Sequence, residues 1–435
     1  MTTISQFRLF VFTILILVPT PYFYYAYGTT DTPAVNDPDL KVETVFEGLE
    51  SPTSMVFLDA DDILVLEKNK GTVQRIIDGN RQDEPVLDLD VAIRAERGLL
   101  GSAVATSSTN DKTFVFLYYT KFNGEGDSEG NRDEKPYGNS VYRYELLDGQ
   151  LVNPKLILDL PSEPGPAHNG GAITIGPDNN LYIPIGDIAG AYSGDVPPDK
   201  NVKTLAQNFV NSTLLDGRAG ILRVDLNGNP VNSQGILGES QPLNLYYAYG
   251  IRNSFGIDFD PVTGRLWDTE NGADFGDEIN LVEPGFNSGW VSAQGIWEVD
   301  ANRQGQKSLN PDNLVNFDKR GKYSTPELTW EESIGPTALK FLHSDALGSE
   351  YQNDLFVSDI VLGRIYHFDM NENRTELALK GPLLDKLAEK RDTGIDDIVF
   401  GENFGGITDL EIGPDGYLYV VSFGKGAIYR IVPAS

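Results

Sequence analysis

The stretch DLEIGPDGYLYVVSFGKGAIYRI, residues 409–431, consists of short apolar runs separated by turn residues. One apolar run ends at the Gly-Pro-Asp-Gly turn of residues 413–416, a second follows it, and a glycine-flanked loop carries Lys425. Pro-Asp-Gly between alternating runs favours a hairpin, because proline fixes φ and glycine adopts the positive φ that tight turns need. The stretch therefore predicts antiparallel strands joined by short turns.

The same order of strand, turn, strand and polar loop recurs along the chain. It is found at residues 54–76, 172–187 and 256–272, and residues 219–230 and 355–369 supply further hairpin halves. Repeated four-stranded units of this kind are typical of propeller blades, and at about 60 residues for each loop-rich blade the chain predicts six. We therefore expect an all-β fold, a six-bladed β-propeller over residues 41–435. The pattern returns at both ends of the chain, so we expect the ends to close the ring together, and the one helix expected is a surface insertion at GPLLDKLAEKRD, residues 381–392.

The composition supports this fold class and excludes several functions. The 435 residues include 45 Gly, 25 Pro, 20 Tyr and 21 Phe, which favours β structure over helices. A formal charge of −30 argues against a nucleic-acid partner, since phosphates require a basic surface. The chain has no cysteine, so disulfides, thiolate catalysis and Cys-ligated metals are excluded. The acidity fits a solvated surface, with local use of some carboxylates for cations as the alternative.

The first 28 residues resemble a targeting segment. Arg8 is followed by a long uncharged stretch that is broken by Pro19 and Pro21, so the segment is short for a spanning helix. A secretory signal peptide cleaved near Gly28 is one interpretation, and an uncleaved N-terminal membrane anchor is the other. Either places the remainder outside the cytoplasmic membrane, as a secreted, periplasmic or cell-surface protein. Residues 29–40 are interpreted as a polar linker.

The segment PAHNGGAITIGPDNNLYIPIGD, residues 166–187, contains the first candidate for chemistry. His168 precedes one predicted strand and Asp187 ends the next, so an antiparallel pairing brings the two side chains together. An aspartate beside an imidazole fixes its tautomer and supports its charged form, as a general base requires. The Asn-Gly-Gly that follows His168 is interpreted as open backbone beside a ligand. A structural histidine is the alternative, and it is the interpretation we give to His343 and His367, whose surroundings lack such features.

A second constellation lies between residues 249 and 290. Arg252 and Asn253 occupy a glycine-flanked loop, where a cation can meet a developing oxyanion. The segment ENGADFGDE, residues 270–278, places four carboxylates around two glycines. Hard oxygen ligands on a flexible loop suit Ca²⁺. A solvated acidic turn explains the same composition, so both interpretations stay open at this point.

Several stretches together resemble a known family. They are ERGLLGSAV (96–104), HNGGAITIGPDNNLYIPIGD (168–187), AGILRVDLNG (219–228), YGIRNSFGIDFDPVTGRLWDTENG with GDEINLVEPGFNSGW (249–290), TWEESIGPT (329–337) and the segment 406–431. In this order they resemble the soluble quinoprotein glucose dehydrogenases and aldose sugar dehydrogenases, the glucose/sorbosone dehydrogenase family. The resemblance implies a six-bladed propeller that holds pyrroloquinoline quinone (PQQ) and Ca²⁺ on one face.

The resemblance also implies roles for individual residues. His168 matches the general base that takes the proton of the anomeric hydroxyl while a hydride leaves for the quinone, and Asp187 matches its acidic partner. Arg252 matches the arginine that stabilises the reduced quinone oxygen, with Asn253 beside it. Glu96 stands where the family often has a Gln touching cofactor or substrate, and Trp330 matches an aromatic residue that lines the sugar site. The Gly272 and Ala273 carbonyls match donors to the catalytic Ca²⁺. Glu278 and the main chain near Ser288 match a further calcium-binding pair.

The chain departs from the family at the cofactor anchors. An Arg-x-Arg pair and a lysine are expected to hold the PQQ carboxylates, but the pair reads Gly406 and Thr408 and the segment before Gly363 has no lysine. Each charge-assisted hydrogen bond contributes about 1.5–3 kcal/mol, so the loss of three corresponds to about three to six decades of affinity. Lys425 and Arg364 are the candidates for replacement cations.

These observations predict a PQQ- and Ca²⁺-dependent oxidation of aldose sugars, with a small sugar substrate and an external electron acceptor as partners. The missing anchors favour an alternative from another class, a PQQ-free propeller that serves as an extracellular binding or interaction module. A third interpretation, a propeller hydrolase or lactonase that uses Ca²⁺ and His168, fits the acidic loop but leaves Arg252 unexplained.

Overall fold

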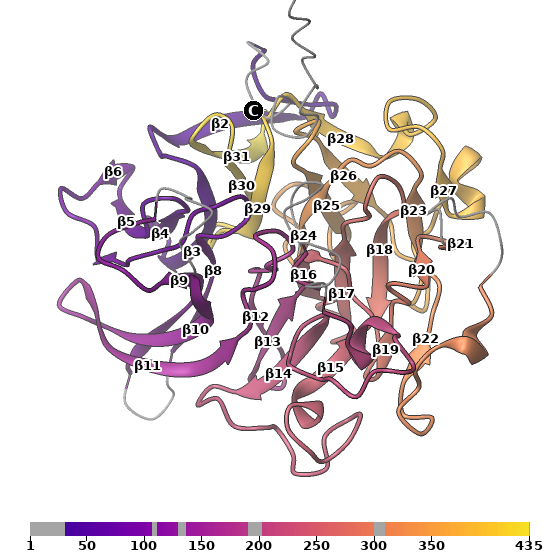
Figure 1. The fold of residues 1–435 in the computed structure, drawn as a ribbon. Coiled ribbons are helices and arrows are strands. Elements are labelled where there is room, and N and C mark those ends of the chain that lie inside the picture. The colour runs from indigo at the N-terminus through magenta and orange to yellow at the C-terminus, as the bar shows by residue number, and fades with distance from the viewer. Residues whose placement is uncertain (1–30, 107–110, 129–135, 190–201, 300–308, 435) are drawn as a thin grey trace, which may run out of the picture.

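The computed structural model describes residues 31–106, 111–128, 136–189, 202–299 and 309–434. Within them six sheets of four to six strands stand around a common centre, and a separate two-stranded ribbon lies beside them (Figure 1). The prediction of an all-β, six-bladed propeller is confirmed. Among the described residues, no helix has the length and apolar character needed to cross a lipid bilayer.

The strands of each blade are as follows. Blade 1 has β3 (Pro52–Asp59), β4 (Asp62–Glu67), β5 (Thr72–Ile77), β6 (Asn80–Arg81) and β7 (Leu87–Asp88), and blade 2 has β8 (Leu99–Thr106), β9 (Thr113–Phe122), β10 (Pro136–Leu147) and β11 (Gln150–Leu160). Blade 3 has β12 (Thr174–Ile175), β13 (Asn180–Ile185), β14 (Gly220–Asp225), β15 (Tyr246–Tyr249), β19 (Phe286–Asn287) and β22 (Lys322–Tyr323). Blade 4 has β16 (Ser254–Phe259), β17 (Leu266–Glu270), β18 (Asp277–Val282), β23 (Leu328–Trp330) and β27 (Leu387–Ala388).

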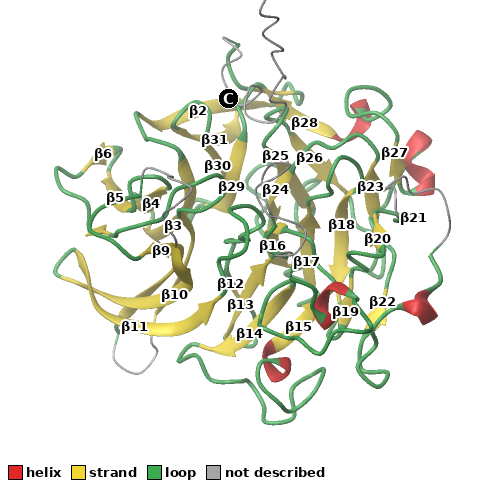
Figure 2. Ribbon diagram, viewed as in Figure 1, coloured by secondary structure: helices red, strands yellow, loops and turns green. Residues whose placement is uncertain are grey.

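Blades 5 and 6 each take a strand from the start of the chain. Blade 5 has β24 (Pro336–Phe341), β25 (Leu355–Asp359), β26 (Ile365–Phe368), β28 (Val399–Glu402) and β1 (Ala34–Val35), and blade 6 has β29 (Ile407–Ile412), β30 (Leu418–Ser422), β31 (Ala427–Pro433) and β2 (Leu40–Glu47). The ribbon is formed by β20 (Ala293–Gln294) and β21 (Trp297–Glu298). The helices described are short 3₁₀ turns (Figure 2): η1 (Leu205–Gln207), η2 (Leu243–Leu245), η3 (Pro311–Asn313), η4 (Gly381–Asp385) and η5 (Asp396–Ile398).

Both ends of the chain close the ring, as the sequence predicts. Strand β2 pairs antiparallel with β31 from Leu40, opposite Pro433, to Glu47, opposite Ala427. Around the ring, β3 contacts β8, β8 contacts β12, β13 contacts β16, β16 contacts β24, β24 contacts β29, and β29 contacts β3. The hairpin of residues 409–431 supplies β29, β30 and β31, so the opening stretch of the sequence analysis forms the closing blade.

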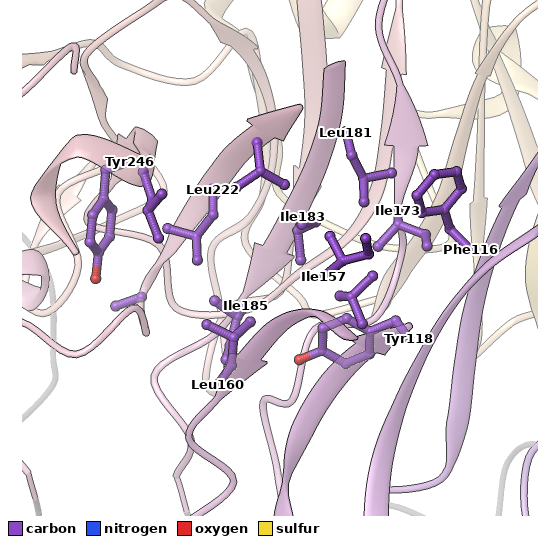
Figure 3. Packing of buried hydrophobic residues seen from close by; sticks show 14 of the residues in the cluster. Phe116, Tyr118, Ile157, Leu160, Ile173, Leu181, Ile183, Ile185, Leu222 and Tyr246 are labelled. Carbon is purple, nitrogen blue, oxygen red and sulfur yellow. The ribbon is translucent and has the colours of Figure 1, made fainter. Parts of the chain in front are cut away.

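The apolar side chains are buried between neighbouring blades. Between blades 2 and 3, Phe116 and Tyr118 of β9 pack against a wall that includes Ile173 and Ile183 (Figure 3). The Tyr118 hydroxyl emerges from this core and donates a hydrogen bond of 2.6 Å to the main-chain oxygen of Asn169. The core between these two blades therefore fixes the loop that carries His168.

Two expectations for local structure are wrong. The segment 381–392 forms η4 and then strand β27 instead of a longer helix, because Lys386 adopts φ 63° and β27 pairs parallel with β23, which satisfies backbone groups at the edge of blade 4. The expected linker at residues 29–40 contains β1, which pairs with β28, and β2 begins at Leu40. The expected targeting segment, residues 1–28, lies outside the described residues.

We expect ring closure to depend on β2. A variant that lacks residues 1–47 leaves β31 as an open edge and loses the buried Leu40 side chain, which alone contributes about 1.5–3 kcal/mol. Its thermal midpoint, followed by circular dichroism, should lie well below that of a control that lacks only residues 1–33. Equal midpoints for the two variants would contradict this dependence.

Candidate active site

Loops between successive strands bring His168 and Asp187 together. His168 lies between β11 and β12, Asp187 follows β13, and β12 pairs antiparallel with β13. The His168 Nδ1 atom lies 2.6 Å from Asp187 Oδ1, and each residue is 8% exposed. The contact that the sequence predicts is therefore present, and because it uses Nδ1, the ring nitrogen left to accept a proton is Nε2.

The Asn-Gly-Gly after His168 has a structural function that the sequence analysis did not predict. Gly170 has φ 66°, and a Cβ there would lie 2.3 Å from the main-chain oxygen of Pro184 in β13. Gly171 has φ 125° and leaves no room for a side chain against Leu100. These glycines let the His168 loop pack against two blades. The interpretation of this backbone as open to a ligand is wrong for Gly170 and Gly171.

The second carboxylate oxygen of Asp187 is held by residues from distant loops. Trp290 donates its indole N–H to Oδ2 at 2.8 Å, and Gln207 donates its side-chain amide at 3.4 Å. Burial alone would raise the pKa of Asp187, yet the nearby His168, the positive charge of Arg252 and these hydrogen bonds hold it below its usual value. Asp187 is therefore an anion that can stabilise a protonated imidazole.

Arg252 lies beside this pair, in the loop between β15 and β16. Its Nη1 atom donates to the main-chain oxygens of Asn271 and Gly272, both at 2.7 Å. Its guanidinium carbon lies 5.6 Å from the centre of the Trp290 ring. Two carbonyls and one aromatic face thus fix the direction of the cation, which is the arrangement needed to stabilise an oxygen that gains negative charge.

Glu96 and Asn253 join the same group of loops. Glu96, between β7 and β8, accepts the main-chain N–H of His168 at 2.5 Å and the side-chain amide of Asn253 at 3.3 Å, both at Oε2. The structure therefore brings four predicted residues, His168, Arg252, Asn253 and Glu96, into one cluster with Asp187.

Buried carboxylates lie next to this cluster in blade 4. Ser288 donates its hydroxyl to Glu270 Oε2 at 2.6 Å and to Glu278 Oε2 at 3.2 Å. Within the described part of the chain, neither oxygen of Asp268 has a donor in full hydrogen-bonding geometry, although Asn280 and Ser254 lie near enough to lower its pKa in part. Burial raises the pKa of Asp268 to about 7, while burial and the neighbouring Asp268 charge raise the pKa of Glu270 to about 8. Burial and Glu270 likewise raise the pKa of Glu278 well above its usual value.

This donor set fits a calcium ion. Buried carboxylates with unmet hydrogen-bonding capacity require a proton or a cation, and Ca²⁺ is bound by carboxylate and carbonyl oxygens. Glu278 and the main chain near Ser288, expected as a calcium-binding pair, lie together here. The Gly272 carbonyl, expected at the catalytic calcium, accepts the Arg252 guanidinium, and Ala273 beside it is half-buried in the loop between β17 and β18.

Three other predicted residues lie elsewhere. Trp330 is fully buried between blades 4 and 5 and packs on Tyr366, so its expected place in the lining of a sugar site is wrong. Thr408 donates its hydroxyl to the main-chain oxygen of Pro52 at 2.8 Å. Lys425, between β30 and β31, directs its Nζ atom to the main-chain oxygen of Asp31 at 2.8 Å.

The sequence analysis missed Trp290 as a member of the site. Trp290 lies 103 residues from Asp187, and its sequence neighbours gave no sign that its indole would reach a carboxylate. Glu270 was noted as part of an acidic segment, but its bond of 2.6 Å to the main-chain N–H of Arg252 was not predicted. The Trp290 contact joins the loops after β13 and β19 of blade 3, and the Glu270 contact joins the loop after β15 to blade 4.

Comparisons with known proteins identify the family of the chain. The family model described as "Glucose / Sorbosone dehydrogenase" matches residues 49–430. The chain is 22% identical over 404 residues to aldose sugar dehydrogenase YliI of Escherichia coli, covering 91% of this chain and 93% of that protein. It is 26% identical over 262 residues to quinoprotein glucose dehydrogenase B of Acinetobacter calcoaceticus, covering 58% of this chain and 52% of that protein.

Solved structures give the same fold. A glucose dehydrogenase-type oxidoreductase of Thermus thermophilus is 25% identical with a TM-score of 0.66, and the match covers 90% of this chain and all of that one. The PQQ-bound aldose sugar dehydrogenase of Streptomyces coelicolor is 20% identical with a TM-score of 0.61, over 92% of this chain and 99% of that one.

The buried carboxylates predict an unusual pH dependence for the metal-free protein. The pKa values of Asp268 and Glu270 are raised in the folded state, so between about pH 4 and pH 8 the folded chain binds more protons than the unfolded chain. The protonated Asp268 and Glu270 side chains therefore favour the folded state fully at pH values below their pKa values in the unfolded chain. This stabilisation is lost as the pH rises toward 8. In the presence of a chelator, Asp268→Asn should reduce the loss in free energy of unfolding between pH 5 and pH 8 by on the order of 4 kcal/mol at most. Denaturant unfolding at the two pH values measures this difference.

Added Ca²⁺ should reverse this dependence. Because the ligands must be deprotonated, Ca²⁺ should raise the thermal midpoint more at pH 8 than at pH 5. Glu278→Gln, which removes the charge of one expected ligand, should reduce that rise. No response to Ca²⁺ in protein freed of retained metal would argue against a calcium site in blade 4.

Proposed function

The chain belongs to the glucose/sorbosone dehydrogenase family, and from this premise we propose that it oxidises aldose sugars at the site around His168, with PQQ and Ca²⁺ as cofactors. The observation that carries the proposal is the bond of 2.6 Å between His168 Nδ1 and Asp187, with the Arg252 guanidinium fixed beside it. A base and a cation held close together suit a reaction in which a hydroxyl loses its proton and the carbon that bears it loses a hydride.

His168 is the proposed general base. With Nδ1 held by Asp187, Nε2 takes the proton of the anomeric hydroxyl, and the anionic Asp187 stabilises the imidazolium that results. PQQ, when bound, supplies the acceptor for the hydride that the anomeric carbon loses, and an external acceptor then removes the electrons. Arg252 keeps N–H groups beyond its two carbonyl partners, and they can donate to an oxygen that becomes negative.

The residues present fit one end of PQQ better than the other. His168, Arg252 and Asn253 suit its reactive end, but positions 406 and 408 offer no cation for its carboxylates. An arginine at position 406 would be strained, because Gly406 has φ 73° and a Cβ there would lie 2.9 Å from the main-chain oxygen of Ile360. We therefore propose that this chain binds PQQ more weakly than relatives that have both arginines.

His168→Ala should lower sugar oxidation by about 10²–10⁴-fold, the usual contribution of a general base. The measurement is dye-linked oxidation of aldoses in protein saturated with PQQ and Ca²⁺. The thermal midpoint should fall as well, because the variant leaves the buried Asp187 carboxylate without its imidazole partner, so turnover is compared under conditions where the variant is folded. His343→Ala is the control for loss of a histidine outside the site. Wild-type turnover in His168→Ala would remove this residue from the reaction.

A cation at position 408 should strengthen PQQ binding. We expect Thr408→Arg to lower the Kd for PQQ in excess Ca²⁺, with a gain that shrinks as salt rises, because part of it is a screened charge attraction. Thr408→Gln is the control, since it also loses the hydroxyl that donates to Pro52 but adds no charge.

The same titration distinguishes the alternative function. If neither the wild-type protein nor Thr408→Arg binds PQQ, the proposed oxidation is wrong for this chain, and the extracellular binding module is the better description. Tight binding by the wild-type protein, unchanged in Thr408→Arg, would show that other cations already hold the carboxylates.

A further inference from the structure

We propose that Glu96 is a positioning residue that holds the loop of His168 through its main chain, in place of the contact with cofactor or substrate that its position in the sequence suggested. The proposal rests on the function proposed above for His168. It assigns to one carboxylate oxygen the task of keeping the imidazole in place before any ligand arrives.

The main chain at His168 needs such support. His168 has φ 61°, in the left-handed region that residues with a side chain rarely adopt, and a conformation of this kind persists where its surroundings enforce it. The main-chain N–H of His168 donates to Glu96 Oε2 at 2.5 Å. A charged acceptor makes this hydrogen bond stronger than one to a neutral group.

The two loops hold each other at two points. While the Glu96 side chain accepts the His168 N–H, the Glu96 main-chain N–H donates to the main-chain oxygen of Pro166 at 3.2 Å. Glu96 therefore holds the main chain on both sides of Ala167, at Pro166 and at His168, and we call this pair of hydrogen bonds the bracket. The main chain at His168 cannot move away from Glu96 without breaking one of them.

Asn253 extends the bracket to a third loop. Its amide nitrogen lies 3.3 Å from the same Glu96 oxygen, and its amide oxygen accepts the Gly170 N–H at 3.3 Å. The loops before blades 2, 3 and 4 are thus joined around one carboxylate. Since Arg252 precedes Asn253, Glu96 fixes the base and the cation relative to each other.

The main chain next to Glu96 is also held in place. Lys68, in the turn after β4, donates its Nζ atom to the main-chain oxygen of Ala95 at 2.9 Å. Burial lowers the pKa of Lys68 to about 8, and the nearby Glu96 charge opposes part of that change. A positive charge on Lys68 in turn balances the carboxylate that it lies beside.

The geometry separates the effect of the length of the Glu96 side chain from the effect of its charge. Both bonds from other loops end on one oxygen of Glu96, so a glutamine, which has one amide oxygen at the same distance from the main chain, can accept both. An aspartate keeps the charge but is shorter by one methylene group. The proposal therefore predicts that Glu96→Gln preserves the bracket, whereas Glu96→Asp and Glu96→Ala break it.

The test uses the three histidines of the full chain. In protein labelled with ¹³C and ¹⁵N at histidine and free of PQQ, His168 gives one of three sets of ring signals, assigned with His168→Ala. We expect the His168 signals of Glu96→Gln to match the wild type, and those of Glu96→Asp and Glu96→Ala to shift and broaden. His343 and His367 are internal references for the fold. Unchanged His168 signals in both Glu96→Asp and Glu96→Ala would overturn the proposal.

Ligand binding and turnover complete the test. Loss of the bracket should lower kcat by on the order of 10–100-fold through misplacement of the base, leave the Kd for PQQ within about twofold, and be rescued in Glu96→Gln. A weaker Kd for PQQ with unchanged His168 signals would identify Glu96 as a cofactor contact and contradict the proposal. The NMR comparison needs neither cofactor nor substrate, so it decides the role of Glu96 even if the protein oxidises no sugar.

Discussion

The closure of the ring by β2 and β31 is the constraint on which the rest of the structure depends. A blade buries its apolar faces only against its two neighbours, so six blades exclude water from their faces only when blade 6 meets blade 1. The contacts between β29 and β3, and the pairing of the first long strand with the last, meet that requirement. Loops from successive blades then converge, which is why residues as distant as Glu96 and Asn253 share one hydrogen-bonding group.

Negative charge dominates the site that this ring creates. Asp187 is stabilised as an anion by specific partners, whereas burial raises the pKa values of Asp268, Glu270 and Glu278 in blade 4, and neighbouring carboxylates raise those of Glu270 and Glu278 further. Arg252 lies between the two groups and contacts blade 4 through both its side chain and its main chain. A divalent cation among the blade 4 carboxylates would remove their mutual repulsion without disturbing the His168–Asp187 pair, which has its own partners.

In the proposed function, the residues assigned to proton transfer are more firmly held than the positions assigned to the cofactor. His168 is held at its ring by Asp187 and at its main chain by Glu96, and Arg252 is held by two carbonyls and the Trp290 face. Gly406, by contrast, adopts a backbone conformation and a close approach to Ile360 that suit glycine alone. The groups around His168 and Arg252 are therefore rigidly held, whereas positions 406 and 408 carry no positive charge.

The sequence by itself determined the hairpins, the number of blades and the proximity of His168 to Asp187, because turn chemistry and strand alternation act over neighbouring residues. The tertiary structure alone decided that Trp290 reaches Asp187, that Glu96 holds the His168 main chain and that Trp330 is buried in a core. It also decided that residues 381–392 supply an edge strand, since the open edge of blade 4 offers backbone hydrogen bonds there. Contacts of this kind join residues far apart in the chain, and their geometry is set by how the blades pack against one another.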